Sequence, residues 1–558
     1  MKKYLKLWVW LSGVGLLCMG PFDIVAAQDP PPLFTELLLP VPAPVRFGEA
    51  AWGDYDADGD LDLFLSGNVR TFDRAEPFSQ LYLNDGDGAV EIPDPDGGEV
   101  PIRVPTTEYV SAFNVGVSIL ENAWQSTVAW GDYDRDGDLD VLVSGIVENG
   151  SYTTRLYTNI GFPRFFESSF SWPGVASGDL DWGDYDNDGD LDVVVSGTDQ
   201  SGRPVSEIYE NQIGIGGGFV QRDVGLIGLT SSSVEWGDYD TDGDLDLLIT
   251  GIAEPQAFIA RVYRNDGNGL FTDIAAGLKG LLYASAAWGD YDADGDLDIV
   301  LNGGKLTPFI LEGTLKMYRN DGGFFTDVSD GIMDAFGVEG ALGRYQGNVA
   351  WGDFDNDGYL DFLVTGSRGP QYIETGQVYK NFLNDQFRTS RRENFGGGIF
   401  GTAFWGDYDG DNDLDIFVVG EKPGEGTVIR SLRNSIPRPD IEFGRINTPP
   451  TAPGGLQATP QAGSVTLSWE AAADAQTPPP GLTYNLRVGS TPGGVDVVSP
   501  MATADGTRLL PTWGNAGHRI IWTLTNLPPG TYYWSVQAVD NGFKGSPFAP
   551  EGTFTIDG

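Results

Sequence analysis

An aspartate-rich phrase, A-W-G-D-Y-D-A-D-G-D-L-D-L-F-L-S-G in its first copy, recurs seven times along the chain. Regular recurrence at this scale is typical of repeat architectures, in which each unit buries its apolar face against its neighbours. The spacing between copies has room for one four-stranded unit per repeat. We therefore predict an all-β protein built on a seven-bladed β-propeller. The tryptophans that mark the copies are Trp52, Trp130, Trp182, Trp236, Trp288, Trp351 and Trp405.

Each copy has the pattern of two strands joined by an Asp-Gly turn, followed by a third strand that ends in Tyr-x-Asn in six copies and a fourth that starts near a Phe. The segment Pro32 to Leu39 resembles a fourth strand that lacks the first three. The seventh copy, by contrast, runs into Pro437 soon after its third strand. We expect the N-terminal strand to complete the last blade, because that closure removes exposed sheet edges.

The turn D-x-D-x-D-G-D-L-D places carboxylates at its first, third, fifth and ninth positions and glycine at its sixth. Calcium takes six to eight oxygen ligands, which such a loop can supply from these side chains and from the carbonyl at position seven. Glycine permits the sharp bend. The sequence therefore predicts about seven structural Ca²⁺ ions, one per blade. The candidate loop residues are Asp54, Asp56, Asp58, Asp60 and Asp62; Asp132, Asp134, Asp136, Asp138 and Asp140; Asp184, Asp186, Asp188, Asp190 and Asp192; Asp238, Asp240, Asp242, Asp244 and Asp246; Asp290, Asp292, Asp294, Asp296 and Asp298; Asp353, Asp355, Asp357, Tyr359 and Asp361; Asp407, Asp409, Asp411, Asp413 and Asp415.

Two copies depart from the pattern, with Tyr359 at position seven of the sixth loop and Asn412 in place of glycine in the seventh. A backbone carbonyl from Tyr359 would serve equally well, and Asn tolerates a left-handed backbone. An EF-hand would need an acid at position twelve, where all seven loops carry an apolar residue. Plain turns without metal are the other alternative. Seven repeats of the same four acids disfavour it, because clustered like charge is destabilising without a cation.

Charge and residue usage restrict the possible functions. The formal net charge is −47, so we expect no nucleic-acid partner. The only cysteine, Cys18, lies near the N-terminus, and the only histidine, His518, lies outside the repeats. A Ser-His or Cys-His catalytic machine is therefore excluded from the propeller, and no nucleotide-binding or zinc motif is present.

Residues 1–27 have the pattern of a secretory signal peptide, with early lysines, an apolar stretch and small residues ending at Ala27. The apolar stretch is too short to span a membrane. We expect cleavage after Ala27 and a secreted or cell-surface protein with no transmembrane segment in its mature chain.

The Asp-rich copies resemble the FG-GAP or VCBS repeats of integrin α-subunit propellers and of many secreted bacterial proteins. The resemblance covers about Pro32 to Asn434 and delimits a propeller domain at 32–436. It implies that the calcium loops join the first and second strands on one face of the disc, and that ligands bind the opposite face. A long segment predicted on that opposite face supplies candidate ligand-binding residues, namely Phe336, Arg344 and Tyr345.

A Pro-rich linker at 437–453 leads into a different domain at 454–558. Strand patterns return there without Asp loops, as in S-V-T-L-S-W-E around Trp469 and in T-Y-Y-W-S-V-Q-A-V-D. This region resembles a fibronectin type III β-sandwich, with Tyr532 in the place of the tyrosine corner. The resemblance implies a spacer or docking module.

Two function classes remain open. The first, which we favour, is a calcium-rigidified protein for extracellular binding or adhesion, with a protein or carbohydrate ligand and no enzymatic activity. The second is a calcium-dependent lyase or glycosidase acting on polysaccharide, since carboxylate pairs are abundant here. The sequence leaves the ligand and the oligomeric state open.

Overall fold

The computed structural model describes residues 34–37, 45–70, 75–84, 89–92, 102–105, 110–111, 122–161, 164–170, 172–213, 217–308, 311–333, 343–367, 376–389, 395, 398–422, 426–434 and 446–557. Over these residues the regular elements are β-strands, together with the short 3-10 turns Ser329–Gly331 and Pro479–Gly481. The protein is therefore all-β, as the sequence predicted. The predicted signal peptide lies outside the described residues, and none of the described residues forms a helix long and apolar enough to cross a membrane.

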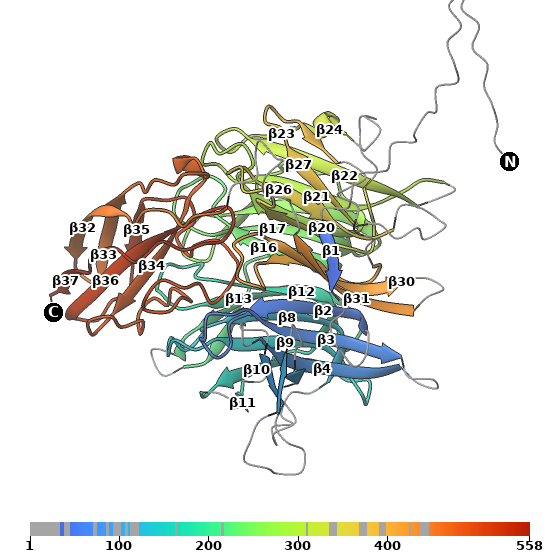
Figure 1. Ribbon diagram of the computed structural model, residues 1–558, viewed down its shortest axis with the longest axis horizontal. Helices are drawn as coiled ribbons and strands as arrows, with labels where there is room; N and C mark the ends of the chain where they lie inside the picture. The colour runs from blue at the N-terminus through green and yellow to red at the C-terminus, as the bar shows by residue number, and fades with distance from the viewer. Residues whose placement is uncertain are drawn as a thin grey trace, which may run out of the picture. The chain divides into compact units, whose positions relative to one another are not determined.

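In each of the first three repeats, strands that follow one another in the chain pair in antiparallel fashion (Figure 1). The first repeat consists of β2 (Val45–Gly53), β3 (Asp62–Arg70), β4 (Ala75–Leu83) and β7 (Val110–Ser111), with a hairpin of β5 (Ala89–Ile92) and β6 (Ile102–Pro105) inserted before β7. The second consists of β8 (Ala123–Gly131), β9 (Asp140–Val147), β10 (Tyr152–Asn159) and β11 (Phe165–Glu167). The third consists of β12 (Val175–Gly183), β13 (Asp192–Asp199), β14 (Pro204–Asn211) and β15 (Phe219–Arg222). The pair Thr153 and Val175 joins the second and third repeats into one eight-stranded sheet.

The next three repeats follow the same order. The fourth consists of β16 (Thr230–Gly237), β17 (Asp246–Ala253), β18 (Ala257–Asn265) and β19 (Phe271–Asp273). The fifth consists of β20 (Leu282–Gly289), β21 (Asp298–Leu306), β22 (Leu311–Asn320) and β23 (Phe325–Asp327). The sixth consists of β25 (Val349–Gly352), β26 (Asp361–Val364), β27 (Gln377–Asn381) and β28 (Phe387–Arg388), and β24 (Ile332–Met333) pairs in parallel with β28.

The seventh repeat combines both ends of the array. Its own strands are β29 (Ala403–Gly406), β30 (Asp415–Lys422) and β31 (Gly426–Asn434), and its fourth is β1 (Phe34–Leu37). Phe34 pairs with Asn434 in the antiparallel register, and Figure 1 shows the blue β1 beside the orange β31. The prediction that the N-terminal strand completes this sheet is confirmed.

The glycine that follows the tryptophan in every repeat explains how neighbouring repeats pack. A Cβ on Gly183 would lie 2.8 Å from the indole of Trp236 in the next repeat, so only glycine lets that indole approach. The same contact links every repeat to its successor, and Gly406 of the seventh faces Trp52 of the first at 2.7 Å. The contacts therefore close into a ring, and the fold of the repeats is a β-propeller.

The asparagine that ends each third strand supplies a second link around the ring. Its side-chain amide donates to a backbone carbonyl in the preceding repeat, as from Asn265 to Tyr185 at 2.8 Å. The corresponding bond occurs in all seven repeats, and Asn84 of the first donates to Tyr408 of the seventh. These donors satisfy carbonyls that would otherwise lie buried without a partner.

Residues 446–557 form two three-stranded antiparallel sheets around one apolar core. One sheet has the order β32 (Gly454–Gln461), β33 (Ser464–Glu470) and β35 (Ile521–Leu524); the other has the order β34 (Thr483–Gly489), β36 (Gly530–Val539) and β37 (Gly552–Ile556). Trp469, Tyr484 and Trp534 lie in the core. The hydroxyl of Tyr532 donates to the carbonyl of Pro528 at 2.7 Å, which is the local bond expected of a tyrosine corner.

Candidate metal centres

The Asp-rich turns between first and second strands share one backbone conformation, and we number them loop one (54–62) to loop seven (407–415). In loop one, Ala57 and Gly59 both have positive φ, at 57° and 102°. This turns the amides of Asp58 and Gly59 toward Asp54, whose two carboxylate oxygens accept them at 3.0 Å. The same pair of bonds forms in all seven loops. The first carboxylate is therefore fixed by the backbone of its own loop.

The two loops that depart from the sequence pattern keep this geometry. Asn412 has a φ of 68°, and its amide donates to Asp407 at 3.0 Å as the glycine amides do. Tyr359 donates its backbone amide to Asp357 at 3.2 Å, as Asp60 does to Asp58 at 3.1 Å. Neither substitution changes the path of the loop.

The ninth residue of each loop is a buried aspartate that accepts one backbone amide in every loop and a second one in loops one to six. Asp246, for example, accepts the amide of Asn265 at 2.8 Å and the amide of Tyr239 at 3.1 Å. The first of these bonds occurs in all seven loops. The ninth carboxylate therefore joins the loop to the end of the third strand, a role that the sequence did not reveal. Each of its oxygens retains a lone pair for a further contact.

Carboxylate oxygens converge within the loops. Oxygens of the first, third and fifth residues lie within 4.8 Å of one another in loops one, two and five, and those of the first, third and ninth do so in loops three and four. The third residue supplies a buried oxygen that accepts no hydrogen bond at Asp56, Asp134, Asp186, Asp240, Asp292 and Asp409. Buried acceptors without a donor are costly, and a hard cation would satisfy them. The donor set therefore fits a calcium-type ion.

The electrostatics of the loops lead to the same conclusion. Burial, followed by repulsion from Asp58 and Asp56, raises the pKa of Asp54 to about 7. Burial likewise raises the pKa of Asp290 to about 7, with a contribution from Asp294. These shifts mean that the protein groups alone disfavour the charged carboxylates, and a divalent ion would reverse that preference.

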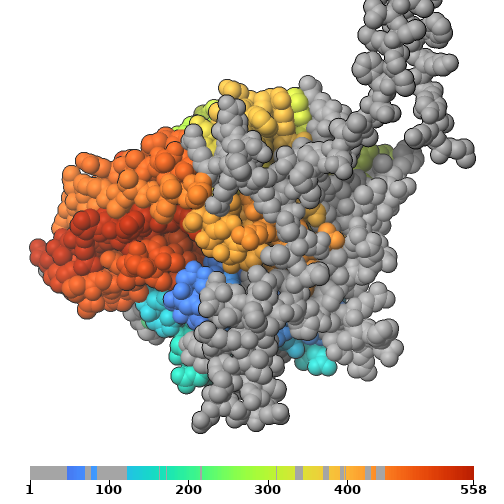
Figure 2. Space-filling view, in the orientation of Figure 1, coloured from blue at the N-terminus to red at the C-terminus, as the bar shows by residue number. Residues whose placement is uncertain are grey.

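The C-terminal residues contact several loops directly. The carbonyl of Leu509 accepts the amide of Asp54 at 2.8 Å, and the carbonyl of Asn541 accepts the amide of Asp353 at 3.1 Å. The guanidinium of Arg519 lies 3.2 Å from the carboxylate of Asp238. In the space-filling view the orange and red C-terminal residues lie against the blue residues of the first repeat (Figure 2). The chain therefore covers part of its own loop face.

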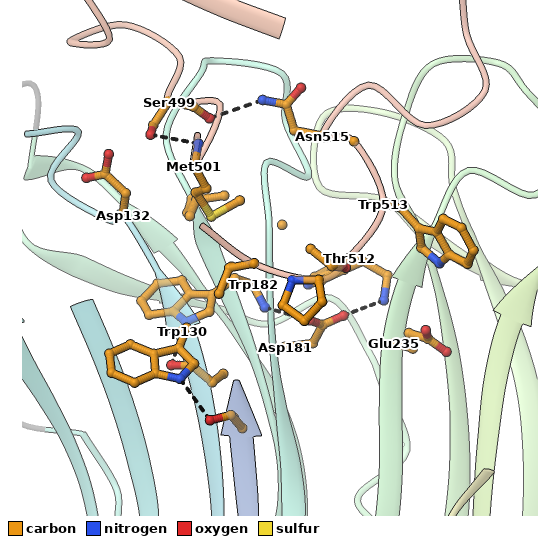
Figure 3. A pocket seen from close by; sticks show the side chains of 18 of the residues that line it. Trp130, Asp132, Asp181, Trp182, Glu235, Ser499, Met501, Thr512, Trp513 and Asn515 are labelled. Atoms are coloured by element: carbon orange, nitrogen blue, oxygen red, sulfur yellow. Dashed lines mark hydrogen bonds between the residues drawn. The ribbon is translucent and has the colours of Figure 1, made fainter. Parts of the chain in front are cut away.

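An inner cavity of about 500 Å³ lies between the first strands of the repeats and the C-terminal segment 498–515. Figure 3 shows Asp181 and Glu235 on the side of the repeats and Met501 and Thr512 on the C-terminal side. Asp181 accepts the amide of Trp236 at 2.8 Å, and Glu235 accepts the amide of Trp288 at 2.9 Å. Both carboxylates therefore bond across to the next repeat while they line the cavity.

A further set of polar side chains, which the sequence predictions do not include, links the first strands. The residue three positions before each tryptophan is polar in every copy: Glu49, Thr127, Asp179, Ser233, Ser285, Asn348 and Thr402. Glu49 accepts the amide of Val128 at 3.1 Å, and Asp179 accepts the amide of Val234 at 3.0 Å. Asn348 accepts the amide of Ala403 at 2.8 Å. Recurrence of a polar residue at this fixed offset was the signal that could have revealed it.

Two of the three candidate ligand-binding residues lie within the described residues, and both are buried. Phe336 lies outside the described residues. Arg344 and Tyr345 are 0% and 2% exposed. The guanidinium of Arg344 donates to the side-chain oxygen of Gln377, and its amide donates to Asn302 at 2.6 Å. Both side chains therefore contact neighbouring strands in this structure.

Comparison with known proteins gives one family match. Residues 184–249 and 254–301, which include loops three, four and five, match the FG-GAP-like repeat. No curated protein matches the sequence.

Several solved structures are similar at low identity. The extracellular domain of a protein described as a hybrid two-component system from B. thetaiotaomicron is 10% identical, with 95% of this chain and 58% of that chain covered and a TM-score of 0.38. This chain thus spans little more than half the length of that one. An α-l-arabinofuranosidase from Fusarium graminearum is 10% identical over 55% of this chain and 92% of its own, with a TM-score of 0.33. Trypanosoma rangeli sialidase is 10% identical over 92% and 86%, with a TM-score of 0.30.

Proposed function

We propose that this chain is a secreted or cell-surface binding protein whose seven-bladed β-propeller is rigidified by structural calcium, one ion per loop. The observation that carries the proposal is the repeated buried oxygen of the third loop residue, which accepts no hydrogen bond in six loops. A cation would satisfy the same atom in each. The propeller precedes a fibronectin type III-like β-sandwich that serves as a docking module.

The seven-blade count rests on the ring of contacts between repeats. Seven glycine–tryptophan contacts and seven asparagine–carbonyl bonds run in one direction, and each series returns to the first repeat. The sheet that contains β1 has four strands with both ends of the array in it. Each repeat then corresponds to one blade.

We infer a structural role for the metal because the loops are spread around the whole ring. A catalytic ion would need one loop to differ by offering an open coordination position beside a substrate site. Instead the seven loops share the same backbone bonds, and the C-terminal residues cover some of them. The extracellular ligand, a protein or a carbohydrate, would then bind the opposite face.

The test is a calcium count on the purified mature protein by elemental analysis after dialysis against micromolar calcium, repeated after dialysis against a chelator. We expect several ions per chain in the first sample and none in the second. Absence of bound calcium in both samples would overturn the structural-calcium proposal and favour metal-free turns. Sequencing of the N-terminus of exported protein tests secretion, with Gln28 expected as the first residue.

A second candidate function is a calcium-dependent lyase or glycosidase for polysaccharide. The inner cavity favours it, because Asp181 and Glu235 line the same space and burial raises the pKa of Asp181 to about 7. Burial also raises the pKa of Glu235 well above its ordinary value, and two carboxyl groups of which one stays protonated are the usual glycosidase machinery. Release of reducing ends or unsaturated products from a panel of acidic and neutral polysaccharides, lost in Asp181→Asn and Glu235→Gln, would establish this activity. No product from any of them would leave binding as the function.

A further inference from the structure

The residue just before each third-strand asparagine lies beside its loop and differs between repeats. It is neutral or acidic in the first three repeats and basic in the last four: Leu83, Thr158, Glu210, Arg264, Arg319, Lys380 and Arg433. The seven loops therefore share one backbone geometry but have different neighbouring charges.

In the sixth and seventh repeats this basic side chain bonds to the carboxylates of the loop itself. Lys380 contacts the carboxylate of Asp355, and its Nζ lies 3.1 Å from that of Asp357. Arg433 places Nε 2.7 Å from Asp409 and Nη2 3.0 Å from Asp411. The third and fifth loop residues, two of the predicted calcium ligands, are thus already paired with a cation in both loops.

In the fourth and fifth repeats the equivalent arginine forms its ion pairs with acids outside the loop. Arg264 pairs with Asp266 at 2.6 Å, and Arg319 pairs with Asp321 at 3.1 Å and with Asp385 at 2.8 Å. Asp266 and Asp321 each follow the third-strand asparagine directly. The sixth and seventh repeats have Phe382 and Ser435 at that position, so they lack the acid that would draw the basic group away.

Loops six and seven carry further features of the same kind. Tyr359 leaves loop six with four aspartates where loops one to five have five. Loop seven receives a second cation, because Nζ of Lys544 lies 2.6 Å from Asp407. Lys380 and Asp355 have side chains only 17% and 8% exposed, so water screens their interaction weakly. A calcium ion entering either loop must displace a positive charge from its own ligands.

We propose that loops six and seven carry built-in counter-ions, Lys380 and Arg433, and bind calcium much more weakly than loops one, two, three and five. Loop four is intermediate, because Arg519 contacts only its first carboxylate, Asp238. This inference rests on the proposed role of the loops as calcium sites. It implies that the sheets of β25 to β31 hold together with little or no calcium while the remainder of the ring requires it.

The experiment is isothermal titration of the calcium-free, full-length mature protein with calcium chloride. We expect a tight and a weak class of site that differ at least about tenfold in affinity, with loop four between them, as displacement of a partly buried cation requires. The variants Lys380→Met and Arg433→Met should each move one ion from the weak class to the tight class. Arg264→Met is the matched control, because that arginine has the same place in its repeat but pairs outside the loop, and it should leave both classes unchanged.

A variant that keeps Lys380 but is expected to strengthen calcium binding at loop six provides a second test. Phe382 is 51% exposed, so Phe382→Asp should be accommodated with the loss only of the contacts of its ring with Lys380 and Arg388, at 5.9 and 5.3 Å. It places an acid where Asp266 and Asp321 stand in their repeats and should draw Lys380 from loop six, again adding one tight site. Circular dichroism of each variant in saturating calcium confirms that the fold is retained.

The outcomes separate this inference from the function on which it rests. Seven sites of equal affinity in the wild type, or unchanged classes in Lys380→Met, Arg433→Met and Phe382→Asp, would overturn the inference while leaving structural calcium intact. A wild type that binds no calcium would overturn the proposed function itself.

Discussion

The ring of repeats and the C-terminal residues 446–557 are stabilised in different ways. The C-terminal core is a single apolar cluster that includes Trp469, Tyr484 and Trp534, and its polar groups bond to one another. The ring has apolar layers too, but between them it buries carboxylates at every loop and along its first strands. Burial of like charge is unfavourable without a compensating ion. The stability of the ring should therefore depend on a bound cation, and that of the C-terminal domain should not.

Chelation should produce the largest difference between the two regions. We expect the calorimetric transition of the ring to fall by more than about 10 °C in excess chelator, because ions bound to the native state alone add stability. The transition of the C-terminal domain should move by less than about 2 °C. A single transition that shifts as one unit would instead show that the loop contacts of Leu509, Asn541 and Arg519 couple the two regions.

Truncation of Trp534 should weaken the C-terminal domain alone. This side chain is 1% exposed in the apolar core, and removal of such a ring costs about 3–5 kcal/mol. Denaturant unfolding of Trp534→Ala should show the same loss with calcium and with chelator. A loss that depends on calcium would contradict the division between the regions; Trp534→Phe, which leaves a smaller void, serves as the control.

Removal of one asparagine link should weaken the ring by a smaller amount. Asn320 is 0% exposed, and its amide donates to Tyr239 at 2.7 Å and to Leu297 at 3.1 Å. Asn320→Ala leaves both carbonyls without this donor, so we expect a loss of about 2–3 kcal/mol in the ring transition. Asn149→Ala, at an exposed turn, should change it by less than about 0.5 kcal/mol. Equal effects of the two substitutions would show that the links contribute little.

The pH dependence should give the smallest effect. Burial, followed by the charge of Asp179, raises the pKa of Glu49, and burial raises that of Asp181 to about 7. A carboxyl whose folded pKa is raised stabilises the protein below its unfolded pKa, and that contribution is lost as pH rises through the folded value. In saturating calcium the ring should therefore lose about 1–2 kcal/mol between pH 6 and pH 8.

Glu49→Gln tests the cause of this slope, because the amide oxygen can still accept the Val128 amide but does not titrate. The variant should show a shallower decline of the unfolding free energy between pH 6 and pH 8. A decline identical to that of the wild type would assign the slope to other groups. The C-terminal transition should have its own decline, because burial raises the pKa of Asp540 to about 7, and Glu49→Gln should leave that decline unchanged.

The sequence predicted those features that depend on local pattern. The strand at Phe34 repeats the pattern of the other fourth strands, which predicts its place in the last sheet, and Phe34 does pair with Asn434. Asn412 was expected in a left-handed conformation, and its φ is 68°. In both cases the backbone requirement acts within a few residues of the one that meets it.

Features that depend on which repeat faces which were not predicted. Glu49 and Asp179 bond to strands of the following repeat, at residues 79 and 55 positions away in the chain. Arg344 is of a residue type that is common at binding sites, yet neighbouring strands bury it. Lys380 pairs within its own loop while Arg264 pairs with Asp266, a difference that becomes visible only when the ion pairs of the repeats are compared. The partners of such side chains can be identified only from the three-dimensional packing.

The pairing of β1 with β31 has a consequence for the order of folding. Phe34 and Asn434 are neighbours in space but 400 positions apart in the chain. Closing so long a loop is entropically unfavourable and cannot occur until the last repeat is available. The ring should therefore remain an open arc, with the edge of β31 unpaired, through most of folding. A chain that lacks Phe34–Leu37 would keep that edge permanently, and we expect such a protein to self-associate through it.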